Sequence, residues 1–242
     1  MRRRLQPGAR LHLDSSDGPV RLDVAAVVVD CDGLLMDSES VWLQMVEQWL
    51  AEHGECDQDA YDFLGLSVDD TALRLLEAAG CSAGGDSIAA GELVAALSAR
   101  YSGLLTAAVR PMPGARELIA SLAGTVPIAV ASNGSRQDVT RLLDQAGILA
   151  MVETVCTIED VVRGKPAPDI YEAALRRLDV DPMRAVALED SPHGASAARA
   201  AGLTVVGVNP DPTIEIAAHH RLGALDQISV IEPGRVAQGW SR

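Results

Sequence analysis

Residues 24–33 read Val-Ala-Ala-Val-Val-Val-Asp-Cys-Asp-Gly, and this stretch decides the fold. Its apolar part, residues 24–29, is too short for a helix and rich in β-branched side chains, which predicts a strand buried on both faces of a parallel sheet. The run ends at Asp30 and Asp32, two charges that are costly there unless a cation or a proton compensates them. The simpler alternative is a strand that ends in an ordinary Asp-Gly turn.

The composition is that of a folded globular protein. The chain has 242 residues, of which 48% are hydrophobic and 22% charged, enough for one large domain or for a core with a second, smaller domain. The net charge of −14 argues against nucleic acid as a ligand, because phosphate backbones need basic surfaces. An acidic protein can still bind a small phosphate where a divalent metal and local donors reverse the field.

No membrane span or disulfide framework is indicated. The chain lacks the run of roughly 18 apolar residues that a span requires, so we expect no membrane partner. Its four cysteines show no Cys-x-x-Cys spacing, which favours reduced thiols and a cytoplasmic protein. Residues 1–20 are interpreted as a flexible tail, because polar residues interrupt any apolar segment after the three arginines at 2–4.

The remaining chain has two regions with different sequence patterns. Residues 35–110 are helical in pattern, and strands alternate with helices after Pro111–Gly114. The expected strands cover 126–131, 151–156, 185–188 and 203–208, and the expected helices cover 139–143, 170–178 and 195–201. The predicted fold class is therefore α/β, an open doubly wound parallel sheet with a Rossmann-like core formed by 21–34 and 111–242 and an inserted helical domain at 35–110.

Polar side chains follow three of the predicted strands. Asp30, Asp32 and Gly33 follow the strand at 24–29. Ser132, Asn133 and Gly134 follow the strand at 126–131, and Glu189, Asp190 and Ser191 follow the strand at 185–188. Ligands of open α/β sheets bind beyond the carboxyl ends of strands, so we expect one site at this edge. Its carboxylates favour a hard metal, with Mg²⁺ preferred. The alternative is that Ser132 and Asp190 or Ser191 only cap the helices that follow.

Lys165 is the only lysine among 20 basic residues, the other 19 being arginine. It lies in the sequence Gly164-Lys165-Pro166-Ala167-Pro168-Asp169. A lysine carries a compact charge on a slender stem, so it fits between close carboxylates where a planar guanidinium would not. Chance placement is the alternative, since one lysine must fall somewhere. We interpret Lys165 as the cation that the opening pair of aspartates requires.

The chain resembles the haloacid dehalogenase-like hydrolase superfamily, in the capped branch of phosphatases and β-phosphoglucomutases. The resemblance extends from about residue 23 to 209 and rests on four motifs in order. They are residues 30–39, Asp-Cys-Asp-Gly-Leu-Leu-Met-Asp-Ser-Glu; residues 131–134, Ala-Ser-Asn-Gly; residues 164–169; and residues 188–191, Leu-Glu-Asp-Ser, with the small residues at 194, 197, 198, 201 and 202. The resemblance identifies the inserted helical domain as a cap.

The resemblance implies a role for each motif residue. Asp30 would be the nucleophile that forms an aspartyl-phosphate, and Asp32 would act as acid and then base. Lys165 would balance the charge between nucleophile and phosphate. Gly33, Ser132, Asn133 and Gly134 would surround the phosphoryl oxygens, and Asp30, Asp32 through its carbonyl, Glu189 and Asp190 would hold Mg²⁺, Glu189 directly or at one remove.

Departures from the family pattern reduce the number of activities that the chain is expected to have. Asp32 argues against dehalogenation, because the dehalogenases lack an aspartate at that position. The mutases grip a second phosphate with cap cations, whereas the matching stretch here, residues 63–68, reads Phe-Leu-Gly-Leu-Ser-Val, and Trp42 replaces a histidine. The phosphonate hydrolases use a cap lysine, which this chain does not have. These features favour a hydrolase of monophosphates.

The sequence therefore predicts an Mg²⁺-dependent phosphatase that acts on a small sugar or polyol phosphate, as a monomer or weak homodimer. Aromatic residues are 3% of the chain, which argues against a stacked nucleobase in the substrate. A phosphosugar mutase of the β-phosphoglucomutase type is the alternative activity. A non-catalytic binding protein on the same scaffold is the alternative from another class.

Overall fold

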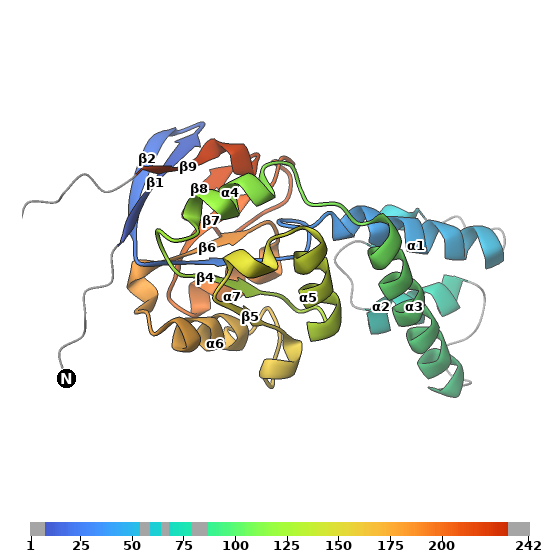
Figure 1. Ribbon diagram of the computed structural model, residues 1–242. Helices are drawn as coiled ribbons and strands as arrows, with labels where there is room; N and C mark the ends of the chain where they lie inside the picture. Colours follow the sequence, from blue (N-terminus) through green and yellow to red (C-terminus); the bar gives the residue numbers. More distant parts are fainter. Residues whose placement is uncertain (1–7, 54–58, 64–67, 79–86, 232–242) are drawn as a thin grey trace, which may run out of the picture. The chain divides into compact units, whose positions relative to one another are not determined.

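The computed structural model describes residues 8–53, 59–63, 68–78 and 87–231 (Figure 1). Contacts between Cα atoms divide the chain into two compact units. The α/β unit comprises residues 1–36 and 111–242, and the helical unit comprises residues 37–110. Within the described ranges, no helix combines the length and the apolar character that a membrane crossing needs.

A six-stranded parallel sheet forms the centre of the α/β unit, with strand order β5-β4-β3-β6-β7-β8. The strands are β3 (Ala26–Val29), β4 (Ile128–Ala131), β5 (Thr154–Cys156), β6 (Ala185–Glu189), β7 (Thr204–Val208) and β8 (His220–Leu222). The strand order departs from β3 in both directions, which confirms the predicted open doubly wound sheet. β3, β4 and β6 are buried along their whole length, as their apolar runs predicted.

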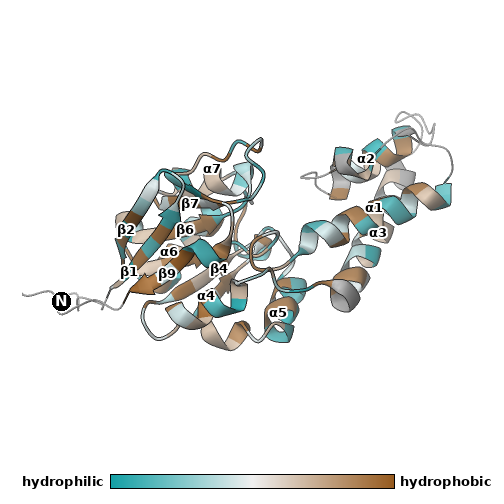
Figure 2. Ribbon diagram, turned by 90° about the horizontal axis from the view of Figure 1, so that it is seen from above, coloured by the Kyte–Doolittle hydropathy of each residue, from teal (hydrophilic) through white to brown (hydrophobic). Residues whose placement is uncertain are grey.

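Helices cover both faces of this sheet. Alternate residues of β3 and β4, such as Ala26, Val28 and Ala129, pack in one cluster with α6 (Asp169–Leu178) and α7 (Pro192–Ala200). Figure 2 shows α7 on one side of the strands and α4 (Ala115–Leu122) and α5 (Arg136–Gln145) on the other. This two-sided cover explains why the central strands read as continuous apolar runs rather than alternating ones. Short 3-10 helices lie at η2 (Leu149–Met151), η3 (Ile158–Asp160), η4 (Pro182–Arg184) and η5 (Leu225–Gln227).

An antiparallel sheet of strand order β2-β1-β9 corrects one expectation. Residues 1–20 were expected to be a flexible tail, and this is wrong for residues 9–20, which belong to a hairpin of β1 (Ala9–Ser15) and β2 (Gly18–Val24) joined by a turn at 16–17. β1 also pairs with β9 (Ile228–Ile231). Leu11 and Leu13 are buried while their neighbours are not, so the apolar signal alternates and forms no run that the prediction could detect.

Two predicted strands are shorter than expected. The run at 24–29 is divided at Ala25, so that Val24 ends β2 and β3 begins at Ala26. The run at 151–156 becomes a strand only from Thr154, because residues 149–151 form a 3-10 helix. The helices expected at 139–143, 170–178 and 195–201 lie at α5, α6 and α7.

The helical unit has a hydrophobic core of its own. Its elements are α1 (Ser38–His53), η1 (Ala60–Phe63), α2 (Val68–Ala78) and α3 (Ser87–Ala108). Its core contains Trp42, Met45, Val46, Trp49, Ala60, Phe63, Ala72, Leu75 and Leu97. Trp42 packs edge-to-face on Tyr101 with ring centroids 5.1 Å apart, and its indole N–H donates to the Phe63 carbonyl at 3.1 Å.

Candidate active site

The end of β3 places Asp30 and Asp32 at the carboxyl edge of the sheet. The Asp30 amide donates to the Leu188 carbonyl at 3.0 Å, so Asp30 continues the pairing of β3 with β6. The chain then turns at Gly33, whose φ of 77° is the left-handed region that glycine enters without strain. Asp30 is only 5% exposed, and its carboxylate therefore needs compensation from neighbouring groups.

The end of β4 brings Ser132 to Asp32. The Ser132 hydroxyl donates to Asp32 Oδ2 at 2.7 Å and accepts from the Gly134 amide at 2.9 Å. A Cβ at Gly134 would lie 2.9 Å from Val139 Cγ2 and 3.0 Å from Ser132 Oγ, so this turn has no room for a side chain. Ser135, not Ser132, caps α5, which leaves Ser132 for the site.

Ser191 does serve as a helix cap, as one alternative held. Its hydroxyl accepts from the Gly194 amide at the start of α7, and Pro192 occupies the first turn. The same hydroxyl donates to Glu189 Oε2 at 3.1 Å. Ser191 therefore both starts the helix and orients a carboxylate of the site.

The side chain of Asn133 holds the backbone of Lys165. Its Oδ1 accepts from the Lys165 amide at 2.8 Å, and its Nδ2 donates to the Lys165 carbonyl at 3.1 Å. A Cβ at Gly164 would lie 2.6 Å from Asn133 Oδ1, so glycine is needed for this close approach. The side chain of Asn133 thus contacts the loop that carries Lys165, and the expected contribution of Asn133 to phosphate binding remains a prediction.

The Lys165 ammonium lies between two buried carboxylates. It donates to Asp30 Oδ1 and to Glu189 Oε1, the latter at 2.6 Å, and its side chain is 6% exposed. Glu189 is fully buried and also accepts from the Tyr171 hydroxyl at 2.5 Å. The structure thus brings Lys165 to Asp30, one of the two aspartates that the sequence left uncompensated.

Burial and mutual repulsion set the charges of this cluster. Burial raises the pKa of Asp30 well above its usual value, and Glu189 and Asp32 add to the rise against the opposing effect of Lys165. Burial disfavours the charged form of Lys165, but Asp30 and Glu189 outweigh it and raise its pKa well above 10.5. Burial, and then the Glu189 charge, also raise the pKa of the Tyr171 hydroxyl. The two carboxylates therefore favour the charged form of Lys165 against the effect of burial.

Asp30, Glu189 and Asp190 offer carboxylate oxygens that lie within 4.8 Å of one another, and all three residues are buried. Oxygen donors at this spacing suit a hard divalent cation such as Mg²⁺, so the residues fit the metal that the family resemblance implies. The Asp32 side chain is not in this cluster, and its carboxylate accepts from the Ser132 hydroxyl. Its expected contribution through the backbone carbonyl remains a prediction.

Sequence reasoning missed two residues of the site. Tyr171 lies in the segment 170–178, which was predicted only as a helix, with no role assigned to its tyrosine. Asn209 follows β7, and its Nδ2 donates to the Asp190 carbonyl at 3.0 Å. A signal was available for Asn209, since it follows a predicted strand at the same edge, but no signal distinguished Tyr171 from an ordinary core aromatic.

The fold is an open, parallel α/β sheet with a helical unit inserted in the chain after its first central strand, and the site lies at the carboxyl ends of the strands. A family model described as haloacid dehalogenase-like hydrolase matches residues 24–202. The chain belongs to this family. The expected family and fold class are thereby confirmed.

Curated relatives and solved structures extend the match. The chain is 32% identical over 189 residues to validoxylamine A 7'-phosphate phosphatase of Streptomyces hygroscopicus subsp. limoneus, covering 74% of this chain and 83% of the relative. It is 30% identical over 188 residues to hexitol phosphatase A of Escherichia coli K12, covering 74% and 81%. A CbbY mutant from Rhodobacter sphaeroides, in complex with xylulose-(1,5)bisphosphate, is 29% identical, covers 84% and 95%, and superimposes with a TM-score of 0.67. The family and the phosphatases among these relatives support a phosphoric monoester hydrolase.

Proposed function

We propose that the protein is an Mg²⁺-dependent phosphatase that hydrolyses a small phosphate monoester through a phosphoaspartate at Asp30. The observation that carries the proposal is the contact of Lys165 with both Asp30 and Glu189, beside the Ser132–Asp32 hydrogen bond. These groups come from the ends of three strands and from one loop, and phosphoryl transfer depends mainly on positioning and on neutralising spread negative charge.

Asp30 is the nucleophile in this proposal. Its carboxylate oxygen bonds to phosphorus as the bond from phosphorus to the leaving oxygen breaks, which divides hydrolysis into two easier steps. Lys165 fixes the orientation of Asp30 and offsets part of its charge. Asp30, Asp190 and the Asp32 carbonyl would hold Mg²⁺ with Glu189, and the bound ion would reduce the repulsion between nucleophile and phosphoryl oxygens.

Asp32 is the acid and then the base. It donates a proton to the leaving alkoxide in the first step and accepts one from the attacking water in the second, so that it ends in its starting state. The Ser132 hydroxyl holds the Asp32 carboxylate in place at 2.7 Å. Ser132 and the amides near Gly134 are the donors proposed to meet the phosphoryl oxygens.

We further propose that residues 37–110 act as the cap that selects a small sugar or polyol monophosphate. The names of the relatives support this class, since two are phosphatases of a hexitol and of validoxylamine A 7'-phosphate. The arginines at 74 and 100 are engaged inside the helical unit: Arg74 donates to the Asp62 carbonyl at 2.7 Å, and Arg100 to Glu52 at 2.6 and 2.8 Å. Neither therefore offers its charge to a second phosphate.

A phosphosugar mutase is the second candidate, favoured by the similarity to a structure that holds a bisphosphate. The segment 64–67, which matches the stretch where the mutases carry phosphate-binding cations, lies outside the described residues, but its sequence Leu-Gly-Leu-Ser has no cation. Conversion of a β-hexose 1-phosphate without release of phosphate would favour the mutase. Release of phosphate from hexitol and sugar monophosphates favours the hydrolase.

A panel of phosphorylated metabolites, assayed for phosphate release with Mg²⁺, tests the proposal. We expect turnover that EDTA abolishes and that Asp30→Asn lowers by at least about a thousandfold, since the nucleophile is removed. Asp17→Asn, at an exposed position of the β1–β2 turn, is the matched control and should keep full activity. Full activity of Asp30→Asn would overturn the proposal, and the absence of turnover in the wild-type protein across the panel would favour a binding protein.

A further inference from the structure

Tyr171 is the one tyrosine that lies in the α/β unit, and its side chain is fully buried. It is in the first turn of α6, six residues after Lys165. The segment between them is short and hydrogen-bonded, with the Ala167 amide donating to the Gly164 carbonyl at 2.9 Å. The positions of the tyrosine ring and of the lysine are therefore fixed relative to each other by the same piece of chain.

Two contacts connect Tyr171 to the lysine of the site. Its hydroxyl donates to Glu189 Oε1 at 2.5 Å, the same oxygen that accepts the Lys165 ammonium at 2.6 Å. The Lys165 Nζ also lies 5.1 Å from the centroid of the tyrosine ring, within the range of a cation–π interaction. Tyr171 thus contacts Lys165 with its ring and orients the acceptor of Lys165 with its hydroxyl.

The rest of the Glu189 carboxylate is held just as closely. Oε2 accepts from the Ser191 hydroxyl at 3.1 Å and lies 3.4 Å from the Ser191 amide. A Cβ at Gly194 would lie 1.8–2.1 Å from the carboxylate atoms, so α7 leaves no room for Glu189 to move toward it. The whole carboxylate is therefore packed against Gly194, and its Oε1 is further held by the Tyr171 hydroxyl and the Lys165 ammonium.

The chemistry of the donor matters as much as its position. A hydroxyl is neutral, so Tyr171 satisfies Glu189 without cancelling the attraction between Glu189 and Lys165. An arginine or lysine in its place would compete for the carboxylate and release the ammonium. A buried carboxylate that loses one donor costs considerable free energy, and its partner cation then loses a defined position.

We propose that Tyr171 is a positioning residue of the reaction: through Glu189 and its own ring, it holds the Lys165 ammonium beside Asp30. The inference rests on the proposed function for its catalytic meaning. Its structural part, the immobilised ammonium, is independent of catalysis.

The single lysine makes this ammonium directly observable. Protein grown with ¹⁵N,¹³C-lysine gives one side-chain ammonium signal, from Lys165, and NMR of the metal-free protein reports its hydrogen exchange. We expect slow exchange in the wild type and an increase of at least about fivefold in Tyr171→Phe, which keeps the ring and removes only the hydroxyl. Ser121→Ala is the matched control, because its hydroxyl donates at 2.7 Å to the Leu118 carbonyl on α4, and it should leave the lysine signal unchanged.

Activity supplies the second readout. Tyr171→Phe should lower kcat about tenfold to a hundredfold and change KM by less, because the ammonium acts mainly in the transition state. Lysine exchange and kcat both within twofold of the wild type would overturn the inference. Should Tyr171→Phe fail to fold, Glu189→Gln carries the same exchange measurement, and an unchanged lysine signal in that variant would overturn it equally. Absence of phosphatase activity in the wild type would overturn the proposed function and leave the lysine measurement valid.

Discussion

The charged residues of the α/β unit and of the helical unit are held in different ways. In the α/β unit, Lys165, Asp30 and Glu189 are buried and come from three separate elements. In the helical unit, Arg100 and Glu52 are 30% and 53% exposed and pair locally between two helices. A buried cluster is costly unless every member is compensated, whereas an exposed pair contributes little either way.

The difference fits the proposed division of labour, in which the α/β unit carries the chemistry and the helical unit selects the substrate. Asp30, Lys165 and Glu189 of the buried cluster each lie in one of the four sequence motifs, whereas Tyr171, which contacts Glu189, lies in none. The helical unit has thirteen acidic residues, and its basic residues are the arginines at 74, 100 and 110 and His53. Nothing in that pattern fixes one substrate, which is why the class of substrate rests on the relatives.

The largest effect separating the two units is expected from their cations. Lys165→Ala should lower kcat about a thousandfold, because two buried carboxylates lose their compensating charge, and Lys165→Arg should lower it at least tenfold because the guanidinium does not fit. Arg100→Ala, the equivalent change in the helical unit, should stay within a few-fold of the wild type. Steady-state kinetics measures all three, and a Lys165→Arg enzyme of normal rate would contradict the argument from the lone lysine.

The glycines offer a second contrast. Gly194→Ala would place a Cβ within 2.1 Å of Glu189, so we expect kcat to fall about tenfold to a hundredfold and unfolding to become easier by about 2–3 kcal/mol. Gly91 lies in α3 with nothing within 4 Å of its Cβ position, so Gly91→Ala should raise the unfolding free energy by about 0.5–1 kcal/mol. Urea unfolding of both variants is the measurement, and equal effects of the same sign would contradict this contrast.

Asn133 gives a smaller effect of the same kind. Asn133→Ala removes both hydrogen bonds to the Lys165 backbone, and we expect kcat to fall about tenfold. Asn133→Asp keeps the acceptor for the Lys165 amide and should lie between the wild type and the alanine variant. If Asn133→Asp has a lower kcat than Asn133→Ala, the side chain of Asn133 acts on the phosphate rather than on the loop that carries Lys165.

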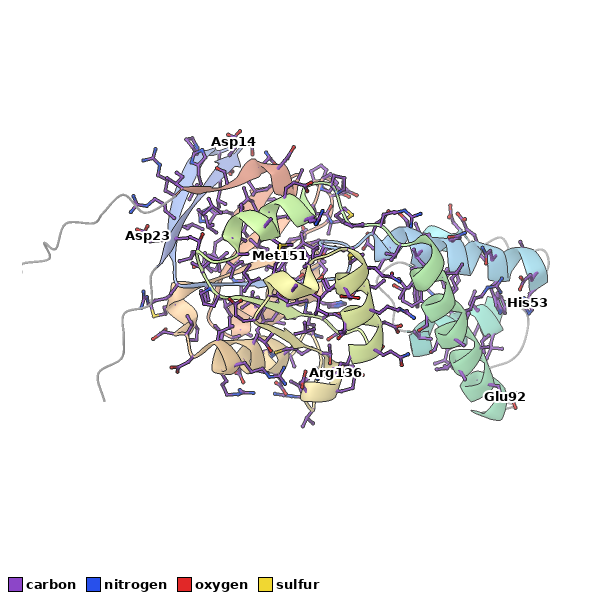
Figure 3. All side chains as sticks on the ribbon, in the orientation of Figure 1. Asp14, Asp23, His53, Glu92, Arg136 and Met151 are labelled. Carbon is purple, nitrogen blue, oxygen red and sulfur yellow. The ribbon has the colours of Figure 1, made fainter. Side chains whose placement is uncertain are left out.

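Asp160 gives the smallest effect, on stability in acid. Burial opposes its ionisation, but Arg136 (labelled in Figure 3), the Thr157 amide and Arg177 lower the pKa of Asp160 from 3.8 to about 2. A depressed folded pKa stabilises the fold above about pH 4, and this contribution is lost as the pH falls toward 2. We expect Asp160→Asn to cost about 1–2 kcal/mol at pH 6, since both arginines are largely exposed, and progressively less below pH 4.

Urea unfolding of the wild type and Asp160→Asn between pH 6 and pH 3 measures that difference. Asp17→Asn, at the exposed turn of the hairpin, should show none at any pH. A gap between wild type and Asp160→Asn that widens as the pH falls would contradict the sign.

The central sheet could be predicted because its strands are covered on both faces and so form apolar runs. β1 and β2 could not, because each packs only one face, and Arg10 and Asp23 on the other face form an exposed ion pair. The expected tail was an error of this origin. A continuous run of apolar residues indicates a strand that is buried on both faces. A strand that is buried on one face is indicated only by alternation of apolar and polar residues.

Most residues of the candidate site were predictable because they follow strands in three motifs, and Lys165 was predictable because it is the only lysine of the chain. The particular contacts of Asn133 and Ser132 were not predictable. The position of a residue after a strand places its side chain at the edge of the sheet but does not say which group it contacts. Tyr171 was hidden for a further reason. Its ring fills the core like any aromatic, and only its hydroxyl, which meets a carboxylate 18 residues away, distinguishes it.

The pairing of β1 with β9 has a consequence for synthesis of the chain. Arg10 lies opposite Ile231 in the register of these strands. One edge of β1 therefore stays unpaired until more than two hundred further residues have been synthesised. The β1–β2 hairpin can form as soon as it leaves the ribosome, because its partner strand is adjacent in sequence. The exposed β1 edge must then be kept from pairing with another nascent chain, and β9, among the last described residues to emerge, closes it.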